Sequence, residues 1–370
     1  MSNSSEENSI VNPELRVRKG RGTLGHRDGR YEELRHEAID DGWGSLDEEP
    51  PPLRTTVTED TSRTVIARNQ SPDVPFEQSI NPYRGCEHGC VYCYARPTHA
   101  YLGLSPGLDF ESRLFAKPNA GQLLAAELRK PSYHCKVIAL GTNTDCYQPI
   151  ERKFKITRQI LGVLSAYNHP VTIVTKSTLV ERDIDILSDM AARGLAHVTL
   201  SLTTFDRKLA RRMEPRAAAP QRRLQTLATL AEADIPTGVL VAPVIPGLND
   251  AEIEKLVTAS AQNGVRTARY VMLRLPLEIS ELFQEWLGAH YPLKKDRVMS
   301  LVRQMRAGRD NDPRFGKRMT GTGNYAAMIE RRFRLVCKQQ GLNRDTTILD
   351  SGKFRVPAHS GDQLALFDAQ

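Results

Sequence analysis

Residues 80–103 read INPYRGCEHGCVYCYARPTHAYLG and contain three of the six cysteines of the chain, Cys86, Cys90 and Cys93. These thiols have the spacing C-x3-C-x2-C, and aromatic residues surround them. Six cysteines in a chain of 370 residues are too few for a disulfide scaffold. A tight group of cysteines is instead typical of a metal or cluster site. We therefore predict that this loop binds metal through Cys86, Cys90 and Cys93.

Two kinds of metal site fit three thiols in one loop. A structural zinc site normally has four ligands in two pairs, and the sequence has no second C-x2-C pair. Cys135, Cys146 and Cys337 are isolated, so zinc would need His88 or His99 as its fourth ligand. Three thiolates also suit a 4Fe-4S cluster in which one iron stays open to another ligand. We favour the cluster, and zinc remains an alternative.

The composition narrows the class of protein. Hydrophobic residues make up 40% of the chain, which is enough for a large core. No apolar run approaches the roughly 18 residues of a membrane span, and MSNSSEENSI at the start lacks the parts of a signal peptide, so we expect a cytoplasmic protein. The net charge of +7 favours an acidic partner such as DNA. Patches such as RKLARRMEPR and ERRFRLVCKQQ are equally typical of a solvated basic face.

Apolar runs typical of buried strands alternate with segments of helical periodicity from about residue 136 onward. Continuous apolar strands separated by helices indicate a parallel α/β sheet that is covered on both faces. The pattern leaves a barrel and an open doubly wound sheet as alternatives. No GxGxxG follows the first strands, so a dinucleotide-binding fold has little support. The strand-like runs are residues 136–142, 171–177, 197–204, 237–247 and 267–276.

The two ends of the chain differ in composition from this core. Residues 1–60 are rich in Gly, Arg, Glu and Pro, so we expect a poorly ordered, or disordered, N-terminal extension. The α/β core is expected over residues 61–277. A helical C-terminal region over residues 278–350 follows, with a loop rich in charge and glycine inside it. Residues 351–370 are expected to form a flexible tail.

The stretch CEHGCVYC resembles the signature of the radical S-adenosylmethionine (SAM) enzymes, C-x3-C-x-aromatic-C. The resemblance implies that the three cysteines bind a 4Fe-4S cluster, that its open iron holds SAM, and that Tyr92 lies near the adenine. In this family the reduced cluster cleaves SAM to methionine and a 5′-deoxyadenosyl radical, which abstracts a hydrogen atom. The family fold is a full or partial TIM-type (βα) barrel with its site at the carboxyl ends of the strands. The resemblance covers roughly residues 78–276, and it implies that the α/β core over residues 61–277 is this barrel.

The resemblance also suggests further SAM contacts, each where a predicted strand ends. Thr144 and Asp145 lie where the family carries a glycine-rich segment that touches the SAM amino group, although its usual Gly-Gly-Glu form is absent here. Lys176 is expected to pair with the SAM carboxylate, and Ser201 to reach the ribose or carboxylate. Ala242 is expected to offer backbone groups to the adenine. The alternatives are a helix cap for Asp145 and ordinary strand-end residues for Lys176 and Ser201.

Within the family, the stretches SINPYRGCEHGCVYCYARPTH, TDCYQPIE, TKS and EPR resemble the group that is related to spore photoproduct lyase and called DNA-repair-photolyase-like. The resemblance implies a lyase or hydrogen-abstraction reaction on nucleic acid, with an electron donor such as flavodoxin or ferredoxin. In spore photoproduct lyase a cysteine returns a hydrogen atom at the end of the reaction. Cys146 is the candidate here, although proline is usual in the group at this position. A semi-buried structural thiol is the alternative.

The stretch QLALF near the C-terminus resembles the peptide with which bacterial DNA polymerases and repair proteins bind the sliding clamp. A flexible tail of this kind places its apolar side chains in a cleft of the clamp, and the alternative is a tail that packs on the core. Two other functions stay open: a radical SAM enzyme for a peptide, a tRNA or a metabolite, and a non-catalytic metal-bearing adaptor for DNA and the clamp. The expected clamp contacts are Gln363, Leu364, Leu366 and Phe367.

Overall fold

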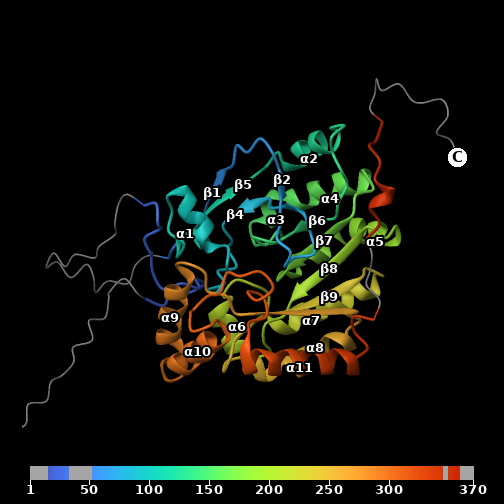
Figure 1. Ribbon diagram of the computed structural model, residues 1–370. Coiled ribbons are helices and arrows are strands. Elements are labelled where there is room, and N and C mark those ends of the chain that lie inside the picture. The colour runs from blue at the N-terminus through green and yellow to red at the C-terminus, as the bar shows by residue number, and fades with distance from the viewer. Residues whose placement is uncertain (1–15, 33–51, 345–348, 359–370) are drawn as a thin grey trace, which may run out of the picture.

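The computed structural model describes residues 16–32, 52–344 and 349–358. A seven-stranded sheet in the order β10-β9-β8-β7-β6-β3-β2 forms its centre (Figure 1). All neighbours from β3 to β10 are parallel, and only the edge strand β2 is antiparallel. The strands of this sheet are β2 (Ile66–Arg68), β3 (Gln78–Ile80), β6 (Ile138–Leu140), β7 (Val171–Thr175), β8 (Ala196–Ser201), β9 (Thr237–Val244) and β10 (Thr267–Met272).

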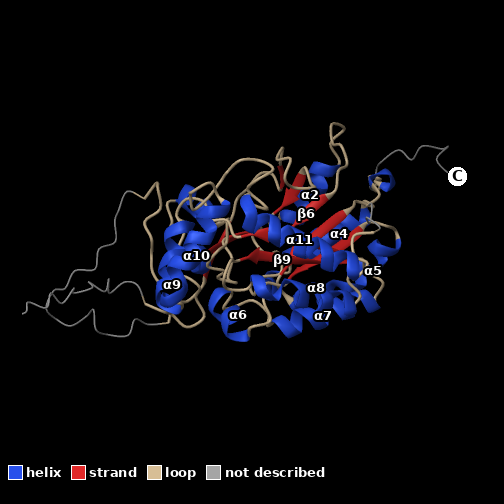
Figure 2. Ribbon diagram, turned by 60° about the horizontal axis from the view of Figure 1, so that its bottom comes forward, coloured by secondary structure: helices blue, strands red, loops and turns tan. Residues whose placement is uncertain are grey.

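Helices connect the parallel strands and lie outside the sheet (Figure 2). A strand that is followed by a helix and then by a parallel neighbour is the repeating unit of a TIM-type barrel. The sheet does not close on itself among the described residues, so the fold is a partial barrel. The connecting helices are α2 (Ala120–Leu128), α3 (Glu151–Phe154), α4 (Ile156–Ala166), α5 (Ile184–Ala192), α6 (Arg207–Met213), α7 (Pro220–Glu232) and α8 (Ile253–Gln262).

The segment between β3 and β6 departs from the repeating unit and carries the cysteine loop. A three-stranded sheet lies here in the order β1-β5-β4 (Figure 1). Because β4 comes only two residues after β3, the chain leaves the barrel for the small sheet just before the first cysteine. The elements of this segment are β1 (Thr56–Glu59), β4 (Tyr83–Arg84), a 3-10 helix (Arg96–Leu102), α1 (Asp109–Ser112) and β5 (Arg113–Ala116).

Among the described residues, three α-helices follow the last strand, namely α9 (Ile279–His290), α10 (Pro292–Met305) and α11 (Gly323–Gln339). Helix α11 packs beside α8 and adds its apolar side chains to the main core. Helices α9 and α10 form a second core together with residues of the cysteine loop. The helical C-terminal region is therefore continuous with the barrel and covers the loop.

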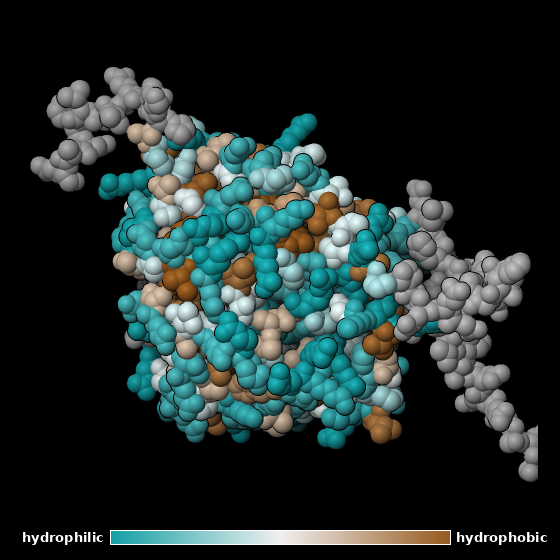
Figure 3. All heavy atoms as spheres, turned by 180° about the vertical axis from the view of Figure 1, so that it is seen from behind, coloured by the Kyte–Doolittle hydropathy of each residue, from teal (hydrophilic) through white to brown (hydrophobic). Residues whose placement is uncertain are grey.

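The main hydrophobic core lies between the sheet and the helices. β7 shows the alternating burial of a strand, with Val171, Ile173 and Thr175 buried and the residues between them half-buried. Each fully buried aliphatic side chain stabilises the fold by about 2 kcal/mol. Hydrophilic residues dominate the face shown in Figure 3, where apolar residues are scattered. No helix in the described ranges has both the length and the apolar character that crossing a bilayer requires.

The strands predicted from residue 136 onward are all present, as are the helices between them. Within the N-terminal extension predicted from composition, residues 16–32 and 52–60 contact the rest of the protein, through Glu111, Glu281 and strand β5. Residues 351–358 likewise lie against the protein, since the Phe354 ring packs on Tyr133 and Tyr167. In both places specific polar and aromatic contacts supply the stability that composition does not reveal.

Candidate functional site

The site lies where the parallel strands end. The cysteine loop follows β3 and β4, and Lys176 is the first residue after β7. Strand β6 leads into residues 141–147, β8 into Thr203, and β10 into Arg274. Since parallel strands all point the same way, their carboxyl ends meet at one edge and bring these segments together.

The three thiols lie close together in this loop. Cys86 and Cys90 are buried and Cys93 is half-buried, and none forms a disulfide. Cys93 packs beside Cys86 in one apolar cluster and beside Cys90 in another. Burial raises the pKa of Cys86 well above its usual value, and the charges of Asp145 and the other two thiols act in the same direction. Burial also raises the pKa of Cys90, to about 12. Bound cations would offset this cost of ionising the thiols.

No group of three His, Cys, Asp or Glu side chains in the described part of the chain gathers closely enough around one point to hold a single ion. A 4Fe-4S cluster is a different case, because each of its thiolates binds a different iron. His99, one of the two candidates for a zinc ligand, has its Nε2 2.9 Å from the carbonyl oxygen of Arg113.

The other candidate zinc ligand, His88, forms a buried pair with Asp145, with Nδ1 3.2 Å from the carboxylate. The other partners of Asp145 are the hydroxyl of Thr175 at 2.7 Å, the amide of Lys176 at 2.7 Å and the amide of Tyr147 at 2.9 Å. Burial alone would raise the pKa of Asp145, but His88 and these hydrogen bonds lower it to about 2. Asp145 thus ties the cysteine loop to the ends of β6 and β7.

Tyr92 is anchored by a buried carboxylate 122 residues further along the chain. Its hydroxyl donates a short hydrogen bond to Glu214, which also accepts one from Thr203 at 2.6 Å and pairs with Arg223. Burial would raise the pKa of Glu214, but Arg223, Lys176 and the two hydroxyls lower it to about 2. The guanidinium of Arg223 is buried and also donates to the carbonyl of Ser201 at 2.9 Å. This network holds the aromatic position of the motif against the ends of β8 and β9.

Lys176 is a cation whose charge acts on Cys90 and opposes the rise in the pKa of that thiol. Its ammonium lies 5.8 Å from the centre of the Tyr92 ring. Burial opposes its charge, but Cys90, Glu214 and Asp145 outweigh burial and raise the pKa of Lys176. Among the described residues, no carboxylate forms an ion pair with this ammonium. It therefore stays available to an anionic ligand.

The other predicted SAM contacts lie near this edge, but their polar groups already have partners within the protein. The hydroxyl of Thr144 donates to the carbonyl of Tyr83 at 2.9 Å. The hydroxyl of Ser201 donates to the carbonyl of Ala242 at 3.2 Å, and that carbonyl also accepts from Thr203. These groups shape the walls of the site, and their direct contact with SAM stays a prediction.

Cys146, the predicted hydrogen donor, has no exposed surface and belongs to the main hydrophobic core. Its neighbours in that core include Tyr147 and Ile156, and it is absent from the two clusters that contain the motif thiols. This placement favours the alternative of a structural thiol. The predicted clamp contacts Gln363, Leu364, Leu366 and Phe367 lie outside the described residues.

An N-terminal segment, residues 16–32, covers the outside of the cysteine loop, and we call it the strap. It lies beside α1 and α9, and Arg27 pairs with Glu281 at 2.9 Å (Figure 1). The carboxylate of Glu111 is fully buried and accepts from the amides of Gly22 at 2.9 Å and Thr23 at 3.0 Å. The same carboxylate pairs with Arg96, which donates to the carbonyl of Cys90 at 2.8 Å. The strap, Glu111 and the loop thus form one connected unit.

The supporting residues Glu111, Arg96 and Arg223 were not predicted from the sequence. Glu214 lies in the EPR stretch, but the sequence indicates no role for it. A signal existed only for Arg96, which lies three residues beyond the last cysteine. The others reach the loop from distant parts of the chain, and spacing does not reveal such contacts.

Comparisons with known proteins agree with this geometry. The sequence model of the radical SAM superfamily matches residues 80–259. An uncharacterized protein of Mycobacterium bovis is 36% identical over 243 residues, which cover 64% of this chain and 72% of that protein. An uncharacterized protein of Methanocaldococcus jannaschii is 30% identical over 213 residues, covering 58% and 76%. A structure of spore photoproduct lyase complexed with dinucleoside spore photoproduct has a TM-score of 0.56 at 17% identity, covering 77% and 80%.

The fold and the three-cysteine loop define an enzyme of the radical SAM class. The chain belongs to the radical SAM superfamily. Enzymes of this superfamily use a 4Fe-4S cluster and SAM, and the residues present fit both groups. Cys86, Cys90 and Cys93 are free thiols that lie together at the edge of the barrel. The charge of Lys176 interacts with the thiol of Cys90, and its contact with SAM stays a prediction.

Proposed function

We propose that this enzyme cleaves SAM reductively and acts on a nucleic acid. A 4Fe-4S cluster with bound SAM supplies, after reduction by one electron, a 5′-deoxyadenosyl radical that removes a hydrogen atom from the substrate. The electron comes from a reductant of the flavodoxin or ferredoxin type. The observation that carries the proposal is the set of three free thiols in one braced loop, with Lys176 beside them.

The residues of the chain have distinct tasks in this proposal. Cys86, Cys90 and Cys93 hold the cluster. Lys176 neutralises the carboxylate of SAM, because a half-buried ammonium without an ion pair interacts strongly with an anion in a medium of low dielectric. Glu214 fixes the Tyr92 ring through a hydrogen bond to its hydroxyl, which leaves a flat apolar surface for the adenine. The second core formed by α9 and α10 excludes water from one side of the loop.

Two observations support a nucleic acid as the substrate. The chain has a net charge of +7, which attracts a polyanion. The solved structure of similar fold named above is described as a spore photoproduct lyase complexed with dinucleoside spore photoproduct. A peptide or a metabolite remains the alternative substrate.

The experiment is SAM cleavage by the full chain after anaerobic reconstitution. We expect about four irons per chain and formation of 5′-deoxyadenosine when a reductant is added. DNA or RNA with deuterium in its sugars or bases should transfer the label into 5′-deoxyadenosine. A labelled peptide or metabolite that transfers its label while nucleic acids do not would refute the nucleic-acid proposal.

The Cys93→Ser variant serves as the matched control, because it removes one thiol ligand and keeps the volume similar. We expect a large loss of iron and no 5′-deoxyadenosine. Full iron content in this variant would contradict the assignment of the cluster. The Cys135→Ser variant should load iron as the wild type does, because Cys135 lies before β6 beside Ser351, away from the loop.

Clamp binding through QLALF is proposed separately, and it is tested by comparing the clamp affinity of the full chain with that of a chain that ends at Asp362. Equal affinities would dispose of this contact.

A further inference from the structure

A charged loop between α10 and α11, residues 306–322, runs past the end of β10. The amide of Met272, the last residue of β10, donates to the carbonyl of Met319 at 2.8 Å. This loop therefore lies against the carboxyl end of β10. Arg306 is fully buried and donates to the carbonyls of Leu273 and Arg318 at 2.8 Å. The charged loop is therefore held at the carboxyl ends of the parallel strands, where the cysteine loop also lies.

Arg274 extends from the end of β10 toward this loop and lacks a carboxylate partner. Its guanidinium lies 5.5 Å from the centre of the Tyr94 ring, and one nitrogen lies 3.6 Å from the sulfur of Met319. Its Nε is buried without a hydrogen-bond partner, and within the described ranges Arg274 makes no ion pair. Burial lowers the pKa of Arg274, and the charge of Arg318 lowers it further. A buried cation in this state is stabilised by an anion.

The positive charge around Arg274 is only partly neutralised. Burial and the charge of Arg274 lower the pKa of Arg306 to about 10. Asp73 pairs with Arg318, and no other carboxylate counts among the main influences on Arg274. Lys317 is exposed and has no ion pair in the part of the chain that the structure describes. The positive charge of Arg274, Arg306 and Lys317 thus favours binding of at least one anionic ligand.

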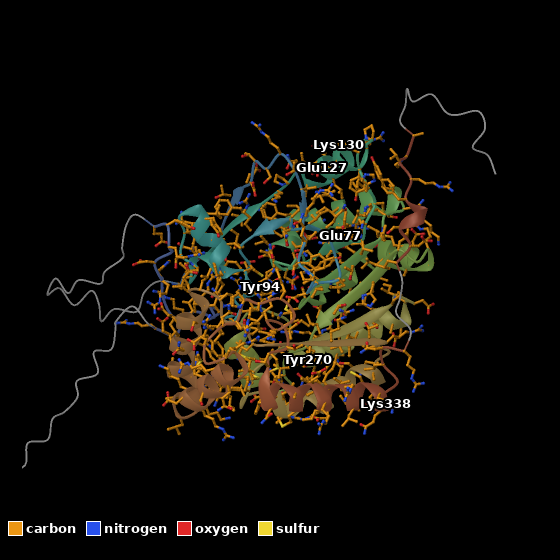
Figure 4. All side chains as sticks on the ribbon, in the orientation of Figure 1. Glu77, Tyr94, Glu127, Lys130, Tyr270 and Lys338 are labelled. Carbon is orange, nitrogen blue, oxygen red and sulfur yellow. The ribbon has the colours of Figure 1, made fainter. Side chains whose placement is uncertain are left out.

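Two exposed aromatic rings lie among these cations. The ring of Phe315 is 59% exposed, and the guanidinium of Arg318 lies 4.6 Å from its centre. Arg318 is itself fixed by Asp73 and Ser71, so it holds the ring in place. Tyr94 is 45% exposed and lies at the centre of the molecule in the view of Figure 4. It directly follows Cys93, which places the surface beside the cysteine loop.

We propose that Tyr94, Arg274, Phe315 and Lys317 form a contact surface for an unpaired stretch of nucleic acid. Arg274 and Lys317 each take a phosphate, and an unstacked base lies on Phe315. Cations that alternate with exposed aromatic rings are the arrangement that binds single strands, because phosphates meet the cations and bases stack on the rings. The inference rests on the proposed function and adds where the substrate binds and in what form.

The experiment measures binding of a short fluorescent single-stranded DNA to the reconstituted full chain by anisotropy, over a series of salt concentrations. Phe315→Ala should weaken binding about tenfold at every salt concentration, since one base loses the aromatic ring on which it stacks. Arg274→Gln and Lys317→Gln should each weaken binding and reduce the slope of log K against log salt by about 0.7, the value for one phosphate of a single strand.

The matched controls are two exposed residues on helices away from this loop. Leu293→Ala on α10 removes an exposed apolar side chain, and Lys338→Gln near the end of α11 removes an exposed charge (Figure 4). Both should bind as the wild type does. Phe315 and Lys317 are exposed, so their variants should keep the fold even if Arg274→Gln is less stable.

The outcomes separate this surface from the proposed function. Wild-type affinity and slope in both Phe315→Ala and Lys317→Gln would overturn the surface, even if labelled nucleic acid still transfers hydrogen. Absence of binding by the wild type would also overturn it. Binding that depends on these residues, without any hydrogen transfer from nucleic acid, would uphold the surface and refute the proposed function.

Discussion

Replacing Gly22 with alanine should detach the strap from the cysteine loop. A Cβ atom on Gly22 would lie 1.7 Å from the carbonyl oxygen of Gly89 and 2.9 Å from its carbonyl carbon. Both atoms belong to the backbone of the cysteine loop, so no side-chain rotation relieves the overlap. The two backbones must move apart by more than about 1 Å, and core positions tolerate such a change poorly.

The magnitude follows from the contacts that this movement breaks. The amides of Gly22 and Thr23 donate to the buried carboxylate of Glu111 at 2.9 and 3.0 Å. A hydrogen bond to a charged group contributes about 1.5–3 kcal/mol, so losing both costs at least about 3 kcal/mol. For a chain of this size we expect the midpoint of thermal unfolding to fall by about 5 °C.

The assay combines the unfolding midpoint with the iron content after anaerobic reconstitution. We expect Gly22→Ala to lower both, because the displaced backbone belongs to the loop that carries the three thiols. Gly162→Ala is the control. A Cβ on this exposed helical glycine meets nothing within 4 Å, so that variant should be more stable by about 0.5–1 kcal/mol. Wild-type stability and iron content in Gly22→Ala would refute the contact between strap and loop.

Three further predictions concern buried polar groups. Glu214→Gln should destabilise the protein by about 3–5 kcal/mol in denaturant unfolding, because it leaves the guanidinium of Arg223 buried without its counter-charge. Glu254→Gln, which removes the more exposed ion pair with Arg332, is the control. A smaller loss of stability in Glu214→Gln than in this control would contradict the prediction. Burial lowers the pKa of His169 to about 4. Between pH 6.5 and 4, this histidine therefore takes up a proton in the unfolded chain but not in the folded chain. The free energy of unfolding should fall by about 3 kcal/mol as the pH falls through this window. Burial also lowers the pKa of His197 to about 4, so His169→Gln should reduce the pH dependence by about 3 kcal/mol without abolishing it. An unchanged dependence would count against the buried neutral histidine. Cys146→Ala should lower stability by only about 1 kcal/mol and leave substrate turnover unchanged, whereas loss of turnover in a stable protein would restore Cys146 as the hydrogen donor.

The parts of the fold that repeat were predictable from the sequence. Buried strands such as β7 are short apolar runs, and α7 begins at Pro220, a signal that belongs to the start of a helix. The parallel arrangement of the strands followed from the alternation with helices, but the alternation alone left a barrel and an open doubly wound sheet as alternatives. Helix α10 was not singled out, although Val298, Val302 and Met305 have helical spacing and Pro292 begins it.

The strap was not predictable because it is held by polar contacts. Segments with few apolar residues are expected to stay unfolded, since they bury too little surface. Here a buried carboxylate, Glu111, collects donors from the strap, and Gly22 allows the close approach to Gly89. Neither the buried carboxylate nor the close approach of the two backbones can be recognised from the local composition.

The ligands of the site were predictable because they lie within eight residues, and a spacing of this kind is a local property. The residues that hold these ligands in place were not predictable. His88 depends on Asp145, and Tyr92 depends on Glu214, so each pairing needs the folded chain. Asp145 shows the limit most clearly. It lies at the predicted place, but its carboxylate binds the protein's own amide, hydroxyl and imidazole groups.

The central claim is that three thiols of one loop hold a cluster that serves SAM cleavage. The most direct measurement is 5′-deoxyadenosine formed per chain by the reduced, anaerobically reconstituted enzyme, compared with Cys86→Ser, Cys90→Ser and Cys93→Ser. The account predicts product from the wild type and none from the three variants, with a parallel loss of iron. Product formation by any of the variants at the wild-type rate would contradict it.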